Sequence, residues 1–516
     1  MSCRSLHAAE AAAGHHGPKL RDHHQSSVER VAHCSSSTVL GIIVTFINTT
    51  RRPALPRLVG MALAGCFGLG LLSAPAIADV QGFDVAAENA QPGSAKWQFP
   101  KRDFTEHTLA FADHTSVLPG DSFGLYVSCR GREFTVTALR VGYYQAIGAR
   151  SIWTSAPTPC SVQRRAVIDR ATGMAKAPWT RSLDITASAW PEGMYVLKVV
   201  SDDKQATYVD LVVRSATTVG RVVFVSSTQT FQAYNQWGGA NVYRGKLGFR
   251  TRARAVTYDR PQTWGYGSGK FLEYEAPLLM RAERLGLPLA YVADTDISAQ
   301  PGLLDGATTI ISAGHSEYWT QKQRDAVMAA RTSGSNLLFF GANSAYWRAR
   351  LSASPLGPNR VMTVYKVAQE DPLRAHPSIR FRDLGQPDAE LTGASYNCFP
   401  AYGRFTVAAA HSFVFKGTGV HNGSSFSGII GPEVDQLLRP AANVELLANS
   451  PTICGKHRTH ASMVIMKDPS GAVTVDVGTM GWVSRVLRGE APEPSVRFAL
   501  IVTDNLLRGS VRRGLS

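Results

Sequence analysis

The segment GHSEYW at 314–319 places a histidine and a glutamate two residues apart. A histidine titrates near neutral pH, and a glutamate provides a carboxylate for proton transfer or metal coordination. At this spacing His315 and Glu317 can both reach one ligand or one metal ion. The same short pattern is also typical of a histidine that hydrogen-bonds to a neighbouring loop beside a glutamate at a helix N-terminus. Its chemistry therefore depends on what else the fold brings to this segment.

Two other segments carry polar and aromatic side chains directly after an apolar run. One contains Asn343 in GANSAYWR, and the other contains Tyr234 in QTFQAYNQWGG. The apolar runs that precede the three segments are predicted to be buried strands, at 221–227, 307–313 and 336–340. Because ligands bind where parallel strands end, we expect the three segments to meet at one edge of a sheet.

Helical segments separate these strands. Thr320 followed by Gln323 indicates a capping box, and Gly334 is well placed to end a helix over 320–333. Strands that alternate with helices over more than a hundred residues predict an α/β fold, with a doubly wound parallel sheet over 219–516. Residues 352–472 are less regular, and we expect them to form an insertion of strands and loops.

Several kinds of active site are excluded by their missing motifs. The sequence has no GxSxG nucleophile elbow, no HExxH zinc motif and no GxxxxGK[ST] phosphate loop. Hydrolysis would therefore have to use an activated water molecule. Asp294 and Asp296 follow a predicted strand, where they could bind a cation or form a turn that caps the next helix.

The part of the chain before residue 219 has a different pattern. From about residue 97 to 214, short segments rich in β-branched and aromatic residues alternate with turn signals, which predicts strands. Short strands of this kind favour a β-sandwich, and we assign it to residues 79–214. The predicted fold class is therefore an N-terminal β-sandwich followed by the α/β domain.

Residues 1–78 are predicted to be a leader. An apolar run at 58–72 follows Arg51, Arg52 and Arg57, and the small-x-small pattern at 76–78 predicts cleavage before Asp79. We therefore expect an exported protein, periplasmic or secreted, with no transmembrane span in the mature chain. An alternative is a lipid anchor on Cys66, because LAGC resembles a lipoprotein box.

Charge and cysteine content support this assignment. Removal of the leader takes away seven Lys and Arg and three Asp and Glu, so the net charge falls from +15 to +11. No basic run is interleaved with aromatic residues, so we expect no nucleic-acid partner. Four cysteines remain, an even number that indicates disulfides in an exported chain. Proximity in the sequence favours the pairs Cys129–Cys160 and Cys398–Cys454 among the three pairings that four cysteines allow.

The order of these motifs resembles a known family. Over most of residues 220–510 the chain is similar to the C-terminal domain of the large (beta) subunit of N,N-dimethylformamidase and its bacterial relatives. The resemblance rests on QAYNQWGG at 232–239, YDRP at 258–261, EAPLL at 275–279, DTD at 294–296, GHSEYW at 314–319, GAN with YWR at 341–348, and GPEVD at 431–435. RVGYY at 140–144 and WPEGMY at 190–195 resemble the sandwich that precedes this domain in such relatives, and the second domain broadly resembles the glutamine-amidotransferase-like fold.

The resemblance implies a mononuclear iron site that activates water for amide hydrolysis. In the family's namesake two tyrosines and a glutamate hold the iron, with a histidine and a second glutamate nearby. The residues that match are Tyr234 and Glu317 as ligands, His315 as the histidine and Glu433 as the second glutamate. For the second tyrosine we prefer Tyr258 to Tyr243, because Tyr258 ends a predicted strand at the same edge. We expect Asn343 to line the pocket.

The predicted function is therefore an exported metal-dependent hydrolase of C–N bonds. The alternative, from a different class, is an exported binding protein for a carbohydrate or an envelope polymer. Trp237, Trp319 and Trp347 lie on the candidate loops and could stack on sugars, although tryptophans beside a sheet edge often serve in packing. The substrate is expected to be a small amide or a carbohydrate-like molecule, and the sequence leaves the oligomeric state open.

Overall fold

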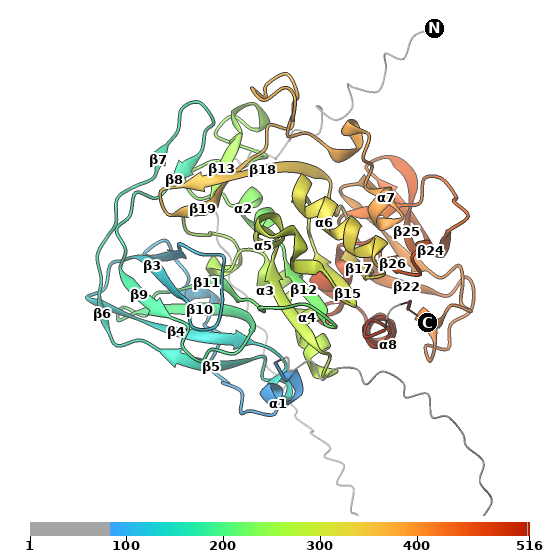
Figure 1. Ribbon diagram of the computed structural model, residues 1–516, viewed down its shortest axis with the longest axis horizontal. Coiled ribbons are helices and arrows are strands. Elements are labelled where there is room, and N and C mark those ends of the chain that lie inside the picture. The colour runs from blue at the N-terminus through green and yellow to red at the C-terminus, as the bar shows by residue number, and fades with distance from the viewer. Residues whose placement is uncertain (1–82, 513, 516) are drawn as a thin grey trace, which may run out of the picture. The chain divides into compact units, whose positions relative to one another are not determined.

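The computed structural model of the protein describes residues 83–512 and 514–515. The predicted leader, its cleavage site and Cys66 lie outside the described residues. Within the described part of the chain, no helix is both long and apolar enough to cross a membrane. Figure 1 shows the β-rich region that contains β3, β4 and β10 beside the region that contains β12, β15 and β17.

Two sheets build the first region. Buried side chains from both of them, such as Phe123 of one and Leu197 of the other, share one hydrophobic core. The first sheet has the order β1 (Thr108–Ala112), β3 (Ser122–Cys129), β9 (Leu183–Thr186). The second has the order β2 (Ser116–Val117), β11 (Ala206–Val213), β10 (Gly193–Ser201), β4 (Glu133–Val141), β5 (Ala149–Thr154), and β6 (Thr158–Pro159) also pairs with β4. The predicted disulfide Cys129–Cys160 is confirmed and ties the end of β3 to the chain after β6.

A nine-stranded sheet forms the centre of the second region. Its order is β14 (Leu289–Ala293), β12 (Val222–Ser226), β15 (Thr309–Gly314), β17 (Asn336–Gly341), β26 (Val473–Asp476), β25 (His457–Lys467), β24 (Val444–Cys454), β21 (Ala401–Thr406), β22 (Ser425–Ile430). The pairs from β14 to β26 are parallel, and those from β26 to β22 are antiparallel. The second predicted disulfide, Cys398–Cys454, is also confirmed and lies at the antiparallel end.

The prediction of an α/β fold with a doubly wound parallel-sheet domain is wrong. The described residues are mostly β, with twenty-six strands and eight α-helices, and the large sheet is mixed. The reason lies in residues 342–472, which form hairpins instead of further strand–helix units. The longest hairpin joins β24 and β25, eleven residues each, across a turn that contains Gly455. Antiparallel neighbours need no helical crossover, so this part of the chain adds strands without helices.

Three smaller sheets and the helices complete the described structure. A four-stranded sheet has the order β13 (Ala255–Thr257), β19 (Gly357–Thr363), β18 (Trp347–Ser354), β16 (Tyr318–Thr320), and the two-stranded sheets pair β20 (Ser395–Cys398) with β23 (Val434–Gln436) and β7 (Val167–Ile168) with β8 (Ala175–Lys176). The helices are α1 (Val85–Asn89), α2 (Thr228–Tyr234), α3 (Phe271–Tyr274), α4 (Ala276–Arg284), α5 (Asp294–Ala299), α6 (Gln321–Thr332), α7 (Ala389–Thr392) and α8 (Glu493–Gly509). The predicted cap of α6 is present, because the Thr320 hydroxyl accepts a hydrogen bond from the Gln323 amide at 3.0 Å.

Both faces of β12 are buried. Val223 and Val225 belong to one core cluster, with residues of α5 and α6, whereas Phe224 belongs to another, with residues of α4 and α8. The second cluster also includes Leu139 and Val196 of the β-rich region, so the two regions share apolar contacts. The contacts group the described residues into one unit, and the domain boundary at 214–219 remains a prediction.

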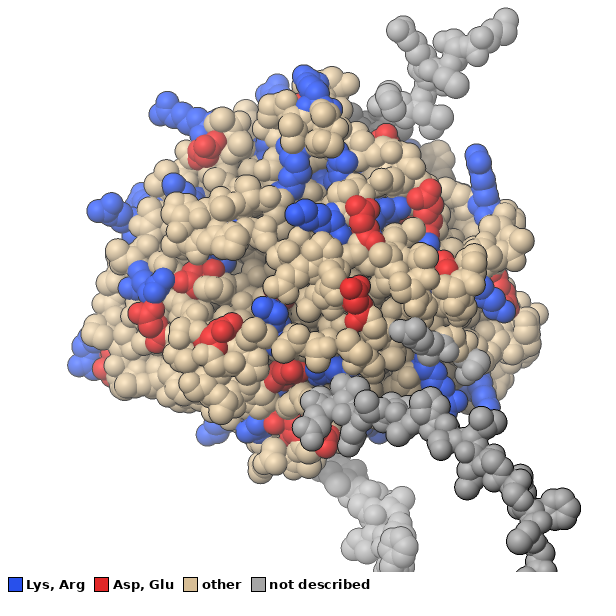
Figure 2. Space-filling view, viewed as in Figure 1, with Lys and Arg blue, Asp and Glu red and all other residues tan. Residues whose placement is uncertain are grey.

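Charged side chains are mixed on the visible surface. Figure 2 shows Lys and Arg scattered over this face with Asp and Glu between them, and no area of a single sign dominates. The formal excess of positive charge is therefore distributed over this face of the molecule.

Candidate functional site

The carboxyl ends of β15 and β17 lead into two of the loops with candidate site residues. β15 ends at Gly314, which has a left-handed φ of +60°. A Cβ at this position would lie 2.4 Å from the carbonyl oxygen of Tyr274, so the turn requires glycine. After β17, Asn343 also has a φ of +60°, which asparagine adopts more readily than most residues. These turns direct His315, Glu317 and Asn343 into the same buried space.

Glu317 lies at the centre of the cluster. Its side chain is 1% exposed. The Tyr234 hydroxyl donates a hydrogen bond to Oε2 at 2.7 Å, and the Tyr243 hydroxyl donates one to Oε1. Tyr234 comes from the end of α2, and Tyr243 from the loop that follows, with 5.0 Å between the two ring centroids. Two phenol oxygens therefore converge on one buried carboxylate.

His315 lies between two carboxylates. Its Nε2 atom is 3.4 Å from Oε2 of Glu317 and 3.5 Å from Oε2 of Glu433. Neither ring nitrogen makes a hydrogen bond within the described structure, although the side chain is buried. A buried imidazole that makes no hydrogen bond is unusual, because buried polar groups are nearly always hydrogen-bonded. Nδ1 has no polar partner among the described residues, and Nε2 has only the two carboxylates at ion-pair distance. The geometry therefore leaves His315 able to bind a further group or move a proton.

Asn343 connects the β17 loop with Glu433. Its side-chain amide donates to Oε2 of Glu433 at 2.8 Å, and its backbone amide donates to Oδ1 of Asp435 at 2.9 Å. The Asn343 carbonyl oxygen Oδ1 is buried and has no partner among the described residues. The amide thus holds Glu433 in place and presents a free acceptor to the cluster.

Two buried lysines, which the sequence analysis did not identify, face the tyrosines. Lys366 donates to the Tyr318 hydroxyl at 2.6 Å, and its Nζ lies 3.2 Å from the Tyr243 ring centroid. Lys270 lies 4.8 Å from the Tyr234 ring centroid. The position of Lys366 in an otherwise apolar run, VYKVA, is a signal that could have drawn attention to it.

The pKa values of the two glutamates are shifted in opposite directions. Burial alone raises the pKa of Glu317, but its contacts with His315, Lys366 and Tyr243 outweigh this effect and lower the pKa to about 2. Burial raises the pKa of Glu433, and the nearby charge of Glu317 adds to the shift. Burial and the Glu317 charge also raise the pKa of Tyr234 and Tyr243. One carboxyl is thus held ionised while the other favours its protonated form.

Tyr258 lies outside this cluster. Its hydroxyl is 3.3 Å from Oγ1 of Thr228, which in turn donates to Asp294 at 2.6 Å. The sequence analysis preferred Tyr258 as the second tyrosine because it ends a predicted strand, but the structure brings Tyr243 to Glu317 instead. Asp294 and Asp296 accept hydrogen bonds from the backbone amides of Gln229 and Ala293, so they cap local structure.

The tryptophans on the candidate loops differ in their surroundings. Trp319 is buried in the core cluster that contains α5 and α6. Trp347 is half-buried, 4.3 Å from Nζ of Lys366 to its ring centroid. Trp237 is half-buried and packs edge-on against Trp179 of the β-rich region, with 5.9 Å between the ring centroids. Trp319 therefore serves in core packing, whereas the side chains of Trp237 and Trp347 remain partly accessible.

The oxygen atoms around Glu317 suit a hard metal ion. Among the described residues, no group of three or more His, Cys, Asp and Glu side chains has the arrangement of a metal site. The two tyrosine hydroxyl oxygens are further possible ligands, because both contact the Glu317 carboxylate. Oxygen ligands of this kind suit ferric iron, and the ring of His315, whose nitrogens make no hydrogen bond, lies beside them. The residues present therefore fit an iron site.

Comparison with known proteins identifies the family. The family model described as N,N-dimethylformamidase beta subunit-like, C-terminal, matches residues 135–491. The chain belongs to this N,N-dimethylformamidase-like family. The match begins in β4, so it includes much of the β-rich region as well as the cluster around Glu317.

Other comparisons add little to the family assignment. A search of curated proteins finds no match. Among solved structures, this chain is similar to a Paenibacillus sp. cycloisomaltooligosaccharide glucanotransferase complexed with cycloisomaltoheptaose, with 9% sequence identity and a TM-score of 0.17. That alignment covers 58% of this chain and 61% of the other, and a score this low supports no statement about fold or function.

Proposed function

We propose that this protein is a metal-dependent hydrolase that cleaves an amide-type C–N bond with water. The observation that carries the proposal is the convergence of two tyrosine hydroxyls on the buried carboxylate of Glu317, with His315 and Glu433 beside it. Membership of the N,N-dimethylformamidase-like family supports the reaction class.

Tyr234, Tyr243 and Glu317 are the residues that would hold the metal, which the family resemblance indicates is iron. Tyr243 replaces Tyr258 in this assignment, because only Tyr243 reaches Glu317. When bound, such an ion supplies Lewis acidity and lowers the pKa of water. The tyrosines must lose their protons to act as ligands. Burial and the Glu317 charge raise their pKa, so the positive charge of a bound ion would have to favour the deprotonated form.

His315 and Glu433 are assigned the movement of protons. In the overall reaction, the oxygen of water adds to the carbonyl carbon, the C–N bond breaks and the departing nitrogen takes a proton. His315 lies between the two glutamates and neither of its nitrogens makes a hydrogen bond, so it is placed to accept the proton that water loses. The raised pKa of Glu433 favours its protonated form, which can donate to the nitrogen.

Asn343 is assigned a positioning role. Its amide nitrogen donates to Glu433, which fixes one carboxyl oxygen and leaves the other for proton transfer. Its own Oδ1 atom is free to accept a hydrogen bond from an N–H group of a substrate. The natural substrate is proposed as an amide.

We also propose that the protein acts outside the cytoplasm. Two disulfides in one chain are typical of oxidising compartments, which supports export. The choice between the periplasm, secretion and a lipid anchor at Cys66 depends on residues outside the described part of the chain.

Metal content tests the proposal directly. The full chain is purified without chelator, and its metals are measured by mass spectrometry together with a visible spectrum. We expect near-stoichiometric iron and an absorption band from tyrosinate bound to iron. Tyr234→Phe and Tyr243→Phe should weaken the band and the iron content, whereas the matched control Tyr258→Phe should leave both unchanged.

Activity is then measured with a panel of small amides, including N,N-dimethylformamide. A protein that holds no metal even after reconstitution would contradict the hydrolase proposal. A band lost in Tyr258→Phe but kept in Tyr243→Phe would instead show that the ligand assignment is wrong.

A further inference from the structure

Two short segments, 162–176 and 244–254, are much more basic than the rest of the chain. Together they contain nine Lys and Arg and one acidic residue, Asp169, so their net charge is +8. Seven of the nine basic side chains are exposed: Arg164, Arg165, Arg170, Lys176, Arg244, Lys246 and Arg250. None of these seven forms a salt bridge with another described residue. Their charge is therefore available to a partner outside the protein.

The two segments lie side by side, and we call their exposed surface the basic patch. The first segment includes the hairpin of β7 and β8, whose turn packs against the end of the second. The carbonyl of Thr172 accepts a hydrogen bond from the Arg254 amide at 2.6 Å, and a Cβ on Gly173 would lie 3.3 Å from the Cα of Ala253. Figure 1 shows β7 and β8 at the margin of the molecule, beside β13, which follows the second segment. The cations of both segments therefore act on one surface.

The acidic side chains at the basic patch are already engaged. Asp169 accepts hydrogen bonds from two backbone amides of the β7–β8 turn, at 3.0 and 2.8 Å. Glu370 pairs with both Arg252 and Arg254, at 2.9 and 3.0 Å. With Glu370 included, the patch still carries +7. Such a surface attracts an anionic partner.

Exposed apolar side chains stand between these cations. Gly245 and Gly248 exchange two backbone hydrogen bonds, at 3.0 and 3.1 Å, which places Lys246 and Leu247 at the tip of a tight turn. The Leu247 side chain is 62% exposed, so folding leaves its apolar surface in water. The other exposed apolar side chains of the patch are Val162, Val167, Ile168 and Phe249. A cluster of this kind marks an interaction surface more often than isolated apolar residues do.

The ring of Phe249 is held in an exposed position. The Arg252 guanidinium lies over the ring, 3.9 Å from its centroid, and also donates to the Phe249 carbonyl at 3.1 Å. Phe249 nevertheless remains 50% exposed. The loop thus presents Leu247 and Phe249 outward on a fixed backbone, and the same loop begins beside Tyr243.

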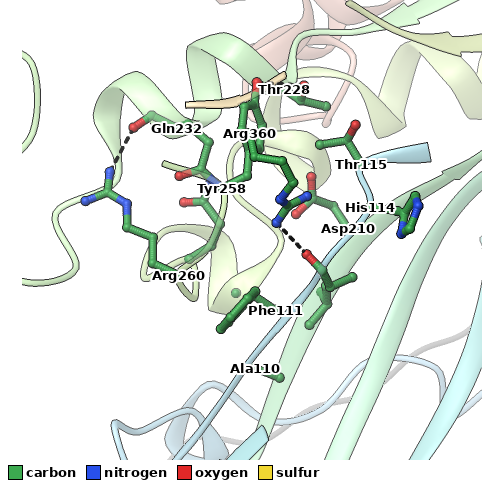
Figure 3. A pocket seen from close by; sticks show the side chains of 14 residues that line it. Ala110, Phe111, His114, Thr115, Asp210, Thr228, Gln232, Tyr258, Arg260 and Arg360 are labelled. Atoms are coloured by element: carbon green, nitrogen blue, oxygen red, sulfur yellow. Dashed lines mark hydrogen bonds between the residues drawn. The ribbon is translucent and has the colours of Figure 1, made fainter. Parts of the chain in front are cut away.

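The arginines around a small cavity between β1, β11 and α2 do not add to the basic patch. Arg360 pairs with Asp259 at 2.6 Å, and Arg260 donates to the backbone carbonyl of Gln232 at 3.2 Å, a bond that Figure 3 shows. Both arginine side chains are buried. They belong to the interior of the protein, whereas the cations of the patch face solvent.

The combination of side chains distinguishes between kinds of anionic partner. A nucleic acid offers bases that stack on aromatic rings, but four of the five exposed apolar side chains of the patch are aliphatic. An acidic polysaccharide is hydrated and offers little apolar surface. An anionic bilayer offers both phosphate groups for the cations and an acyl boundary for the apolar side chains. The patch therefore fits a bilayer surface best.

We propose that the basic patch docks the protein on an anionic lipid bilayer, with Leu247 and Phe249 inserted at the boundary between headgroups and acyl chains. The proposal is independent of the hydrolase proposal, because none of the residues assigned to the metal or to proton movement lies in the two segments.

Sedimentation with lipid vesicles tests the inference. The protein is used without its predicted leader, because the apolar run at 58–72 would bind lipid by itself and lies outside the unit that the described residues form. The probes are vesicles of phosphatidylglycerol and phosphatidylcholine in equal amounts, vesicles of phosphatidylcholine alone, and heparin as a soluble polyanion. We expect saturable binding to the anionic vesicles that weakens as the salt concentration rises, and no binding to the neutral vesicles.

Variants of the loop tip separate the contributions of charge and apolar contact. Lys246→Gln with Arg250→Gln should weaken binding to the anionic vesicles about thirtyfold, because each cation near such a surface contributes about fivefold. Leu247→Ser should weaken it at least about fivefold through lost apolar burial.

The loop between β23 and β24 provides the matched control. Leu438 is 61% exposed and is followed by the exposed Arg439. β24 lies on the opposite side of the view from β7 (Figure 1). Leu438→Ser with Arg439→Gln removes the same kinds of side chain, and its affinity for the vesicles should stay within about twofold of the wild type. Thermal unfolding of each variant checks that it is folded.

Several results would overturn the inference. No binding to anionic vesicles at low salt would do so, as would binding that the charge variant leaves unchanged. Binding to heparin without binding to vesicles would assign the patch to a soluble polyanion instead. Full affinity in Leu247→Ser would show that the apolar side chains do not insert. Iron content, measured on the same samples, reports separately on the hydrolase proposal.

Discussion

A buried ion pair joins the β-rich region to the second region, and its loss should destabilise both. Arg140 of β4 and Glu283 of α4 have fully buried side chains. The guanidinium donates to both carboxylate oxygens, at 3.1 and 2.8 Å, and also to the hydroxyls of Tyr144 and Tyr291. The charged groups of the pair therefore have hydrogen-bond partners within the protein and no contact with solvent.

Glu283→Ala removes the carboxylate and leaves the Arg140 charge buried without compensation. Loss of one partner of a buried pair typically costs about 3–5 kcal/mol, which is a large fraction of the stability of a folded protein. Replacement of both residues, by Arg140→Met with Glu283→Leu, should recover most of the loss because no charge remains buried. The exposed pair Arg497 and Glu493 on α8 provides the control, and Glu493→Ala should cost only about 0.3 kcal/mol.

The measurement is urea-induced unfolding at pH 7, followed by tryptophan fluorescence and far-UV circular dichroism. The two probes should report the same transition, since apolar residues of both regions belong to one core cluster. A loss below about 1 kcal/mol in Glu283→Ala would refute the reasoning, because it would mean that water reaches Arg140. Separate transitions for the two probes would show that the regions unfold independently.

Three further predictions concern other parts of the molecule. Burial raises the pKa of Glu275 to about 8 and that of Asp294 to about 7. The folded state therefore binds more protons than the unfolded state in this pH range, and the free energy of unfolding should fall as the pH rises from about 5 to about 8.5. Glu275→Gln should reduce this slope, measured by urea unfolding at several pH values, and an unchanged slope would contradict it. The Cys398–Cys454 disulfide closes a separation of 56 residues, so Cys398→Ser with Cys454→Ser should cost about 4 kcal/mol, measured by unfolding beside a reduced wild-type sample. If Glu433 donates a proton, the rate of amide hydrolysis should decline as the pH rises through the raised pKa of Glu433. Glu433→Gln should abolish activity while iron binding persists. Activity in that variant equal to the wild type would remove Glu433 from the mechanism.

Local sequence patterns predicted individual elements well. The strand that ends at Gly314 and the Thr320 cap of α6 lie where apolar runs and capping residues placed them. Both disulfides pair cysteines that are near in sequence. Such features depend on contacts between residues that are close along the chain, which is why composition and spacing reveal them.

The sheet topology depended on contacts that are distant in sequence. β17 pairs with β26, more than a hundred residues later, and the residues between them add antiparallel strands to the same sheet. A strand of Val and Ile residues looks alike whether its neighbour is parallel or antiparallel, so the pattern of β25 did not reveal its partners. The prediction of a fully parallel sheet failed for this reason.

The sequence by itself determined the family, and it predicted His315, Glu317, Asn343 and Tyr234 as candidate site residues because they follow apolar strands in recognisable motifs. Only the tertiary structure decided which second tyrosine meets Glu317. Tyr258 follows a strand directly, but its hydroxyl turns toward Thr228, whereas Tyr243 lies in an irregular loop that folds back over the cluster. The path of such a loop is set by its packing against β16 and β18 and by buried partners such as Lys366. These contacts arise only once distant segments have assembled, so no local pattern records them.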